Sequence, residues 1–320
     1  MKVKLLIVEK VGLAWVVFTS VLILVMWPHL ASPWQMVGVR IAWIAATLLL
    51  ARIASISSPL GEVGRGLLFF LRTAAALAWL SVFYPETYEF NRWRDNFDWW
   101  FAEADWHLFG CQPALEMSKL LDSPWWSEAF NLGYFSYFPM IAILIIAIAL
   151  SRSSSTILPS PLLPRVGAVI LASFFIYYTI YIALPVAGPQ FYFAAIGPEA
   201  AAQGIYPKIG TYFDTQTAML PAPGWTDGFF YKLVALTQHT GERPTAAFPS
   251  SHIGIATIVL ILALRHARRV VPLLLPLCLL LYGATIYIQA HYLVDAIAGL
   301  ITAPIVLWLA SRLTGYEFKP

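Results

Sequence analysis

The chain has 320 residues, of which 59% are hydrophobic and only 12% are charged. A soluble domain carries about 25% charged residues, so this chain has too few polar groups to cover its surface in water. The composition excludes an ordinary soluble domain and favours lipid as the solvent, and the net charge of +3 is too small to indicate a partner.

Apolar segments recur along the chain, and each is close to the ~20 residues that a membrane-spanning helix needs. We expect eight such helices, although Pro276 lies inside the seventh, which membrane helices tolerate. The first follows three lysines and is interpreted as a retained helix rather than a cleaved signal. The sequence therefore predicts an all-α, polytopic membrane helical bundle. In chain order, the expected helices are Val11–Trp27, Met36–Ala51, Gly66–Phe83, Asn131–Leu150, Val166–Val186, His252–His266, Val270–Ile288 and Val294–Leu313.

The distribution of lysine and arginine predicts the orientation, because cytoplasmic loops are enriched in basic residues. With both termini in the cytoplasm, twelve of the twenty basic residues lie on that side and six on the other. Arg40 and Arg72 fall within helices near their starts, from where their side chains can snorkel to an interface. The twelve cytoplasmic residues are Lys2, Lys4, Lys10, Arg52, Arg65, Arg152, Arg165, Arg265, Arg268, Arg269, Arg312 and Lys319.

This orientation turns the two long polar loops, at about residues 84–130 and 187–251, to the outer face of what we expect to be a bacterial inner membrane. The first loop contains an aromatic-rich segment, residues 91–106, in which four aromatic residues share one side at helical spacing. Such a segment is typical of a helix that lies in the membrane interface, and the alternative is a lid that admits a lipid substrate. The four aromatic residues are Trp93, Phe97, Trp100 and Phe101.

Two histidines are expected at the same membrane face. His252 opens the sixth helix and His291 precedes the eighth, and between them the chain runs one helix inward and one outward. At a rise of ~1.5 Å per residue, a helix of about 17 residues spans about 25 Å, close to the hydrocarbon thickness. The return therefore brings His291 back to the level of His252.

Asp295 lies four residues after His291, so the two side chains share a face if the helix begins near His291. A carboxylate there accepts the ring N–H and fixes the tautomer, which leaves the other nitrogen as a directed lone pair. A histidine with such a lone pair can act as a covalent nucleophile. We therefore predict His252, His291 and Asp295 as catalytic residues.

The residues around His252 predict a phosphate-binding site. A helix N-terminus binds phosphate through its free N–H groups and its positive dipole end, and Ser250 and Ser251 add hydroxyl donors. Arg243 offers a forked donor that matches phosphate oxygens. The alternatives are purely structural roles for these residues, or a metal held by the two histidines and the aspartate.

These segments, FPSSH at 248–252 and HYLVD at 291–295, resemble the lipid phosphatase/phosphotransferase superfamily that is named for type 2 phosphatidic acid phosphatase. Its motifs are Lys-x6-Arg-Pro, Pro-Ser-Gly-His and Ser-Arg-x5-His-x3-Asp. The departures are Leu236 in place of the motif lysine, Ser251 in place of the glycine, and Ala284-Thr285 in place of Ser-Arg.

The altered pattern is more similar to the branch that contains inositol phosphorylceramide synthases, whose segments read AFPS-x-H and THHYFVD. Residues 247–252 and 290–295 fit that form, and the segments 128–137 and 187–189 also resemble the branch. Tyr134 and Tyr137, inside one of these segments, are candidate substrate-binding residues together with Lys232. We divide the chain into two N-terminal membrane helices, residues 1–62, and a lipid phosphatase/phosphotransferase-like domain with a six-helix core, residues 63–320.

The resemblance implies that His291 attacks phosphorus to form a phosphohistidine, that Asp295 orients it, and that His252 protonates the leaving oxygen. It implies no metal, no other cofactor and no nucleic acid. Its partners are a phospholipid or lipid phosphate, the bilayer, and a ceramide or diacylglycerol acceptor. One motif cation, Arg243, remains, which suits a singly charged diester better than a doubly charged monoester, although Lys208 or Lys232 could refill the site.

We therefore expect a lipid phosphotransferase, and the alternative is a lipid phosphate phosphatase. The acceptor distinguishes them, because water gives hydrolysis and a lipid hydroxyl gives transfer. A transporter is the non-enzyme alternative, but transporters place ionisable residues near the membrane midplane and often contain inverted repeats. Here the charges cluster at helix ends and no repeat is visible.

Overall fold

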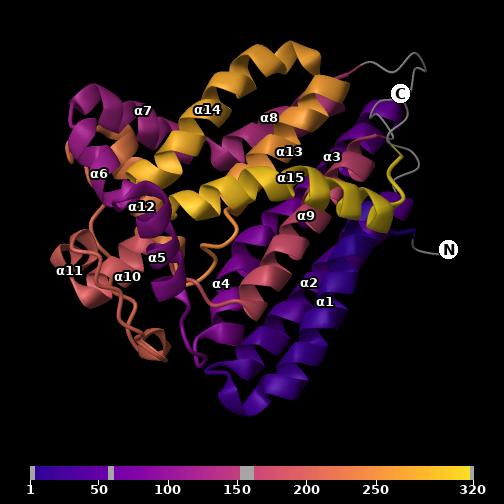
Figure 1. Cartoon of the computed structure of the whole chain (residues 1–320). Helices are drawn as coiled ribbons and strands as arrows, with labels where there is room; N and C mark the ends of the chain where they lie inside the picture. Colours follow the sequence, from indigo (N-terminus) through magenta and orange to yellow (C-terminus); the bar gives the residue numbers. More distant parts are fainter. Residues whose placement is uncertain (1–3, 57–60, 152–161, 318–320) are drawn as a thin grey trace.

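The computed structural model describes residues 4–56, 61–151 and 162–317, and every regular element in these ranges is helical (Figure 1). Lys2, Arg152 and Lys319 lie outside the described residues. Short 3-10 turns occur at Trp27–His29, Tyr212–Asp214 and Arg268–Val270. The α-helices are α1 (Ile7–Met26), α2 (Pro33–Ile56), α3 (Gly61–Ala78), α4 (Leu80–Asn91), α5 (Asp98–Phe109), α6 (Pro113–Leu120), α7 (Pro124–Phe135), α8 (Tyr137–Ala149), α9 (Leu163–Ala183), α10 (Pro189–Ile196), α11 (Pro198–Ala202), α12 (Phe229–Gly241), α13 (Ser251–His266), α14 (Val271–Tyr287) and α15 (Leu293–Thr314).

Six helical segments of the described chain are long and apolar enough to span a membrane, which confirms the prediction of a polytopic helical bundle. The α7–α8 pair, bent by 51° at its break, adds a seventh span if it crosses as one unit. The remaining expected helix, the sixth, corresponds to α13, which is apolar but has only 16 residues. The six segments are Ile7–His29, Pro33–Ile56, Gly66–Asn91, Leu163–Ala183, Arg268–Tyr287 and Leu293–Thr314.

Helix α9 is the centre of the bundle. Most of its residues are buried, and it packs against α1, α3, α4, α13 and α15. In one of these contacts the ring of Trp15 stacks on Phe175 with centroids 4.5 Å apart. Because α9 is apolar on all sides, it is stable only when other helices surround it.

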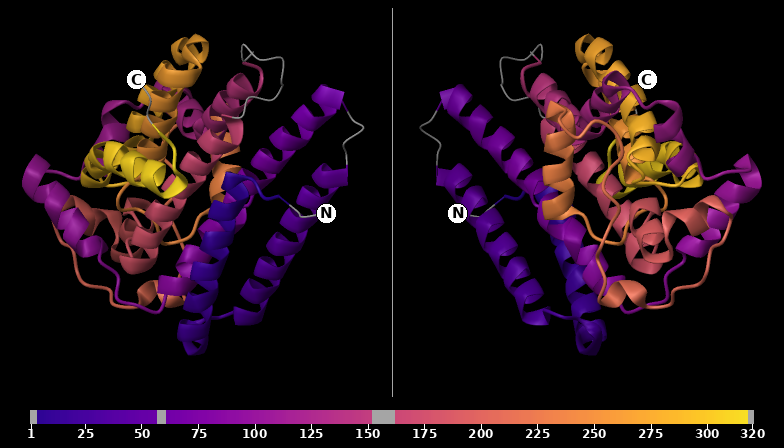
Figure 2. Two further views of the ribbon diagram at one scale, coloured as in Figure 1. Left: turned by 90° about the vertical axis from the view of Figure 1, so that its right-hand side faces the viewer. Right: turned by 90° about the vertical axis from the view of Figure 1, so that its left-hand side faces the viewer.

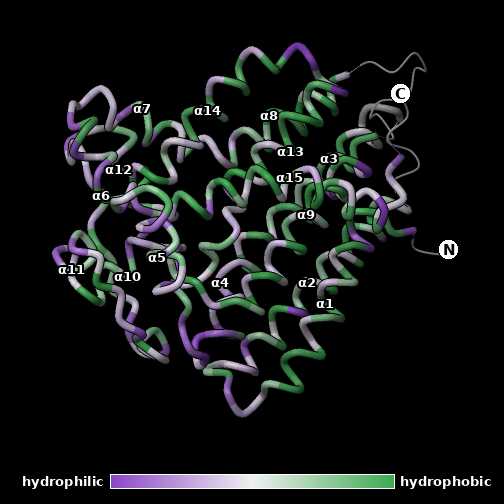
Figure 3. Tube along the Cα trace, viewed as in Figure 1, coloured by the Kyte–Doolittle hydropathy of each residue, from purple (hydrophilic) through white to green (hydrophobic). Residues whose placement is uncertain are grey.

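The outer helices are hydrophobic along most of their length (Figure 3). They expose apolar side chains, as expected of a surface that faces lipid. Leu24, Val25 and Leu313 are each 72% exposed. Helices α1, α2 and α3 lie together on one side of the helices that follow them in the chain (Figure 2). Helix α2 packs against α1 and α3. These observations agree with an integral membrane protein.

Two buried ion pairs hold Arg40 and Arg72, the two arginines that the sequence places within helices. Arg40 is 4% exposed and donates to Glu86 Oε1 at 2.6 Å. Arg72 is 5% exposed and donates to both oxygens of Glu9, at 2.7 and 2.5 Å. In an apolar interior a buried carboxylate partner stabilises a charge that would otherwise have to reach water.

The two long loops contain short helices that gather at one end of the bundle, at the left of Figure 1. α1 begins and α15 ends at the opposite side of that view. The predicted aromatic face of residues 91–106 is wrong, because α5 begins only at Asp98. Within α5, Trp100 is 58% exposed whereas Phe101 is 6% exposed, so the two rings lie on different sides.

Candidate active site

The site is built where α13 and α15 begin side by side. The backbone N–H of Ser250, the N-cap of α13, donates to the carbonyl of Asp295 at 3.1 Å. The helices approach so closely that a Cβ atom on Gly299 would lie 2.5 Å from the Ser250 carbonyl oxygen. This packing brings together two segments that lie about 40 residues apart in the sequence.

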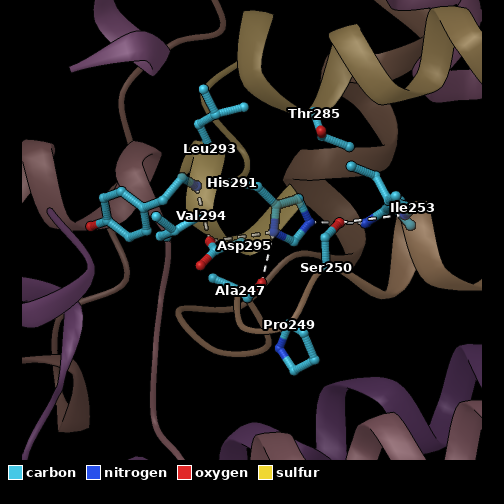
Figure 4. Close-up of polar contacts among 12 residues, drawn as sticks. Ala247, Pro249, Ser250, Ile253, Thr285, His291, Leu293, Val294 and Asp295 are labelled. Carbon is cyan, nitrogen blue, oxygen red and sulfur yellow. Dashed lines mark hydrogen bonds and ion pairs between the residues drawn. The ribbon is translucent and has the colours of Figure 1, made fainter. Parts of the chain in front are cut away.

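The structure brings His252 and His291 into direct contact, as the helix geometry predicted. His252 Nδ1 lies 3.2 Å from His291 Nε2. His291, in the turn between α14 and α15, is only 2% exposed, and its Nδ1 lies 2.8 Å from the carbonyl oxygen of Ala247 (Figure 4). Burial lowers the pKa of His291 from 6.5 to about 4, and the hydrogen bond to Ala247 opposes that shift.

These contacts fix the tautomer of His291. A carbonyl oxygen can only accept, so the proton of the neutral ring lies on Nδ1. Nε2 is then a bare lone pair that faces His252, and the Nδ1–H of His252 donates to it. This state of His291 is the one in which an imidazole can attack an electrophile.

Asp295 lies behind His291, but it is not the direct hydrogen-bond acceptor that the sequence predicted. Its Oδ2 atom is 3.7 Å from His291 Nδ1 and accepts instead from the backbone N–H of Tyr292 at 2.9 Å (Figure 4). Ala247 takes the predicted role of fixing the ring. Asp295 therefore contacts the site through the backbone of Tyr292 and not through a direct hydrogen bond to the imidazole.

Two tyrosines of the bent α7–α8 pair pack against His252. Tyr134 stacks on its imidazole with ring centroids 4.8 Å apart, and Tyr137 approaches it with centroids 4.4 Å apart. The hydroxyl of Tyr137 donates to the Ser251 carbonyl at 3.3 Å. Both candidate substrate-binding tyrosines are therefore at the site, and they hold the His252 ring.

The two serines contribute differently from the prediction that both bind phosphate. The Ser250 hydroxyl accepts from Ile253 N at 3.4 Å as the cap of α13, and this side chain lines neither cavity at the histidines. The N–H of Ser251 donates to the hydroxyl of Tyr181 at 3.0 Å, although Ser251 does line one cavity. Two of the N–H groups at the start of α13 are thus already bonded within the protein.

A small polar cavity lies over the histidine pair. Its volume is 20 Å³, room for about one water molecule. Arg243 lines it together with both histidines, as expected for a phosphate-binding arginine, and Glu242 and Gln190 form part of the same wall. A phosphate group can therefore enter only if side chains around the cavity move.

An apolar cavity of 180 Å³ adjoins the same histidine. His252 and Glu242 line both cavities. The rest of the wall comes from α4, α7, α8, α9, α12 and α13 and is rich in aromatic side chains. Its aromatic members are Tyr84, Tyr134, Tyr137, Phe138, Phe174 and Tyr178. The combination of a polar cavity and an apolar one fits an amphipathic ligand.

The two lysines considered in the sequence analysis lie away from the site. Lys232 is exposed, and its Nζ lies 3.6 Å from Asp227 Oδ1. Lys208 Nζ lies over the ring of Trp99, 4.3 Å from its centroid. Neither lysine lines the two cavities, so Arg243 is the only lysine or arginine among their described lining residues.

Sequence reasoning missed two buried aspartates of α5 that hold the site loops. Asp98 accepts from the backbone N–H groups of Ala187 and Gly188 at 2.6 and 2.7 Å, and from the hydroxyl of Tyr292 at 2.9 Å. Asp105 accepts from Leu293 N and Val294 N at 2.8 and 2.9 Å, and burial raises its pKa to about 6. Their spacing of seven residues, two helical turns, was the available signal.

Among the residues that the structure describes, no group of three His, Cys, Asp or Glu side chains is arranged to hold a metal ion. Asp295, the third residue of the metal alternative, lies too far from the histidines to share a metal ion with them in this arrangement, because its Oδ2 atom is 3.7 Å from His291 Nδ1 on the side of the ring away from His252. The metal alternative therefore has no support from the side-chain geometry of these residues.

A family model described as the PAP2 superfamily matches residues 100–309. The match includes Asp105 and both histidine segments, and it begins two residues after Asp98. No curated protein and no solved structure matches the chain.

Proposed function

Because the chain belongs to the PAP2 superfamily, whose family model covers well over half of it, we propose that it is a membrane lipid phosphotransferase similar to the inositol phosphorylceramide synthases. The observation that carries this proposal is the pair of imidazoles 3.2 Å apart beneath a cavity that Arg243 lines. A phosphatase or phosphotransferase acting on lipids is the broader activity that the family supports.

In the first step the Nε2 lone pair of His291 attacks phosphorus, so a P–N bond forms and the bond from phosphorus to the leaving oxygen breaks. His252 gives its proton to that oxygen. An anionic phosphate favours the protonated, cationic form of a nearby imidazole, so the substrate itself prepares His252 as the acid. Arg243 neutralises charge on the phosphoryl oxygens.

The hydrogen bond between the two rings must break during this step. The Nε2 lone pair that would attack phosphorus is the one that accepts from His252, so it is occupied in the resting site. The polar cavity of 20 Å³ is also too small for a phosphate group. We therefore expect substrate entry to break the histidine–histidine hydrogen bond.

In the second step the acceptor hydroxyl gives its proton to His252 and attacks phosphorus, and the P–N bond breaks to return the lone pair to His291. Between the steps the phosphorylated ring carries a positive charge. The carboxylate of Asp295, 3.7 Å from Nδ1, and the carbonyl of Ala247 stabilise that charge. Ceramide or diacylglycerol would serve as the acceptor.

The apolar cavity supports a lipid substrate, because its aromatic wall continues from His252 toward the α4–α8 side of the bundle. An acyl chain there would leave the phosphate at the polar cavity. We propose, as the loop charges predict, that the site faces away from the cytoplasm and that both termini are cytoplasmic. The division at residues 62 and 63 likewise remains a prediction.

A product assay tests the proposal. Purified protein in detergent is given a phospholipid labelled in its headgroup phosphate, with and without ceramide or diacylglycerol. Transfer of the labelled group to the acceptor lipid is the expected result, whereas release of inorganic phosphate from a monoester would establish the phosphatase instead. Absence of both products, or equal turnover by a His291→Gln variant, would contradict both enzymes.

A further inference from the structure

Glu242 lies where the polar and apolar cavities meet, and it lines both of them beside His252. Its Oε1 accepts from the hydroxyl of Tyr134 at 2.6 Å, and Tyr134 stacks on His252. Its Oε2 accepts from the side-chain amide of Gln190. A carboxylate therefore occupies the wall of the site in which an anionic substrate would have to react.

The formal charges in the polar cavity balance before any substrate enters. Of the described residues that line it, Arg243 carries a positive charge and Glu242 carries the opposing one, while His291 is neutral because burial lowers its pKa to about 4. Since Glu242 already balances Arg243, the one further positive charge that this wall can offer a ligand is the protonated His252, which compensates about one negative charge. A doubly charged group adds a charge that nothing in this wall compensates.

The hydrogen bonds to Glu242 favour its carboxylate form. Burial raises the pKa of Glu242, and donors from Tyr134, Gln190 and Gln238 oppose that shift. A second anion placed against it must either face the carboxylate or force it to take up a proton. Both routes cost binding free energy, and the cost grows with each charge on the ligand.

We propose that Glu242 makes this site selective for phosphodiesters, which carry one negative charge, over phosphate monoesters, which carry nearly two. The inference rests on the proposed function, since it concerns which lipid phosphorus reaches His291. It assigns to Glu242 a role in substrate selection, with no part in bond making.

The competing role for Glu242 is purely structural. Gln238 donates to Gln190 at 3.1 Å and Gln190 donates to Glu242, so the same side chains tie α12 to α10 and α7. A structural role predicts that a change at Glu242 lowers turnover of every substrate alike. A role in substrate selection predicts that the same change alters the ratio of monoester to diester turnover.

The test compares wild type, Glu242→Gln and Gln190→Glu with two lipids of equal acyl chains, phosphatidic acid as the monoester and phosphatidylinositol as the diester. We expect Glu242→Gln to raise the monoester-to-diester ratio of kcat/KM by about tenfold. Gln190→Glu places a second carboxyl group against Glu242, and the ratio should fall at a pH at which both groups are ionised. Thermal unfolding in detergent identifies any variant that does not fold.

An unchanged ratio in both folded variants would overturn the inference, as would a shift in the same direction in both. A matched variant, Gln238→Ala, weakens the network without changing charge, and an equal shift there would also overturn it. These outcomes differ from failure of the proposed function, in which wild type shows no His291-dependent turnover of either lipid.

Discussion

The Nδ1 atom of His252 lies 3.2 Å from the Nε2 atom of His291, and the carbonyl of Ala247 holds the opposite nitrogen of the second ring. The three groups come from the start of α13, the turn before α15 and the loop before α13. Their contact sets the direction of the His291 lone pair. Because the proposed chemistry depends on that direction, substitutions in the residues that hold the rings test it as well as substitutions of the histidines.

Replacement of either histidine should abolish turnover. His291→Gln removes the nucleophile and is expected to lower kcat by at least ~10³-fold, and His252→Gln removes the acid and should cost ~10²–10⁴-fold. His266→Gln is the matched control, because His266 lies at the other end of α13 against Tyr316. Turnover is measured with the labelled phospholipid, and a chelator should leave the wild-type rate unchanged.

The stability of the protein should depend on pH through His291. Its pKa is 6.5 in an unfolded chain and about 4 in the folded one, so the unfolded chain binds more protons between these values. The contribution of the neutral ring is therefore full above 6.5 and is lost as the pH falls toward 4. Thermal unfolding of wild type and His291→Gln in detergent measures this contribution. The amount by which wild type is more stable than the variant should shrink as the pH falls from 6.5 to 4.

Asp105, whose pKa burial raises to about 6, contributes with the opposite sign over part of the same interval. The difference between wild type and the variant cancels that contribution, because Asp105 is present in both proteins. A wild-type advantage that stays constant from 6.5 to 4 would contradict the buried, neutral state of His291.

Asp98 should be required to hold the site. It bonds Ala187 N and Gly188 N, and the adjoining carbonyl of Val186 accepts from Ala247 N at 2.9 Å, so the chain of contacts ends at His291. In Asp98→Asn the side-chain NH₂ group faces a backbone N–H group, so that N–H loses its acceptor. Each group left without a partner should lower the free energy of unfolding by about 1–3 kcal/mol. The free energy of unfolding and kcat are both measured.

The control for that substitution is Asp95→Asn, because Asp95 is exposed on the same segment. Asp95→Asn should change the free energy of unfolding by no more than about 0.5 kcal/mol and should leave kcat unchanged. Equal behaviour of the two variants would show that Asp98 does not support the loop.

Gly188 should resist substitution. Its φ is +97°, in the region that favours glycine, and a Cβ atom would lie 2.6 Å from the Ala290 carbonyl oxygen, one residue before His291. Gly188→Ala should therefore lower both thermal stability and turnover. Gly38→Ala, in α2 with open space around its Cβ position, should be neutral or stabilise by up to about 1 kcal/mol. Equal effects of the two changes would contradict this account of the turn.

The sequence predicted the helices well because each apolar run must find apolar surroundings wherever the chain folds. Even Pro276, expected inside the seventh helix, lies inside α14. The sequence could not predict the 51° bend between α7 and α8, because the apolar run from Asn131 to Leu150 continues across the break. Nor could it predict that Arg40 pairs with Glu86, because a charge within an apolar run has several ways to be neutralised.

The two histidines could be placed together because helix rise and membrane thickness leave little freedom along the membrane normal. The residues that hold the histidine loops could not be predicted, because their contacts join distant segments of the chain. Asp98 bonds to Gly188, and Asp105 bonds to Leu293. The same limit explains Asp295, whose spacing from His291 was read correctly but whose oxygen is used by Tyr292 N. Glu242 stood beside Arg243 in the sequence, yet only the cavity walls show that both face the histidines.

The most direct test of the covalent mechanism traps the intermediate. Wild type is mixed with phospholipid labelled with ³²P in the headgroup phosphate without any acceptor lipid, so that the second step lacks its acceptor, and is then quenched and digested. The account predicts a label that is stable to alkali and labile to acid on the peptide that contains His291, and no such label in His291→Gln. A label on another residue, or catalysis by wild type with no labelled His291 at any time after mixing, would contradict it.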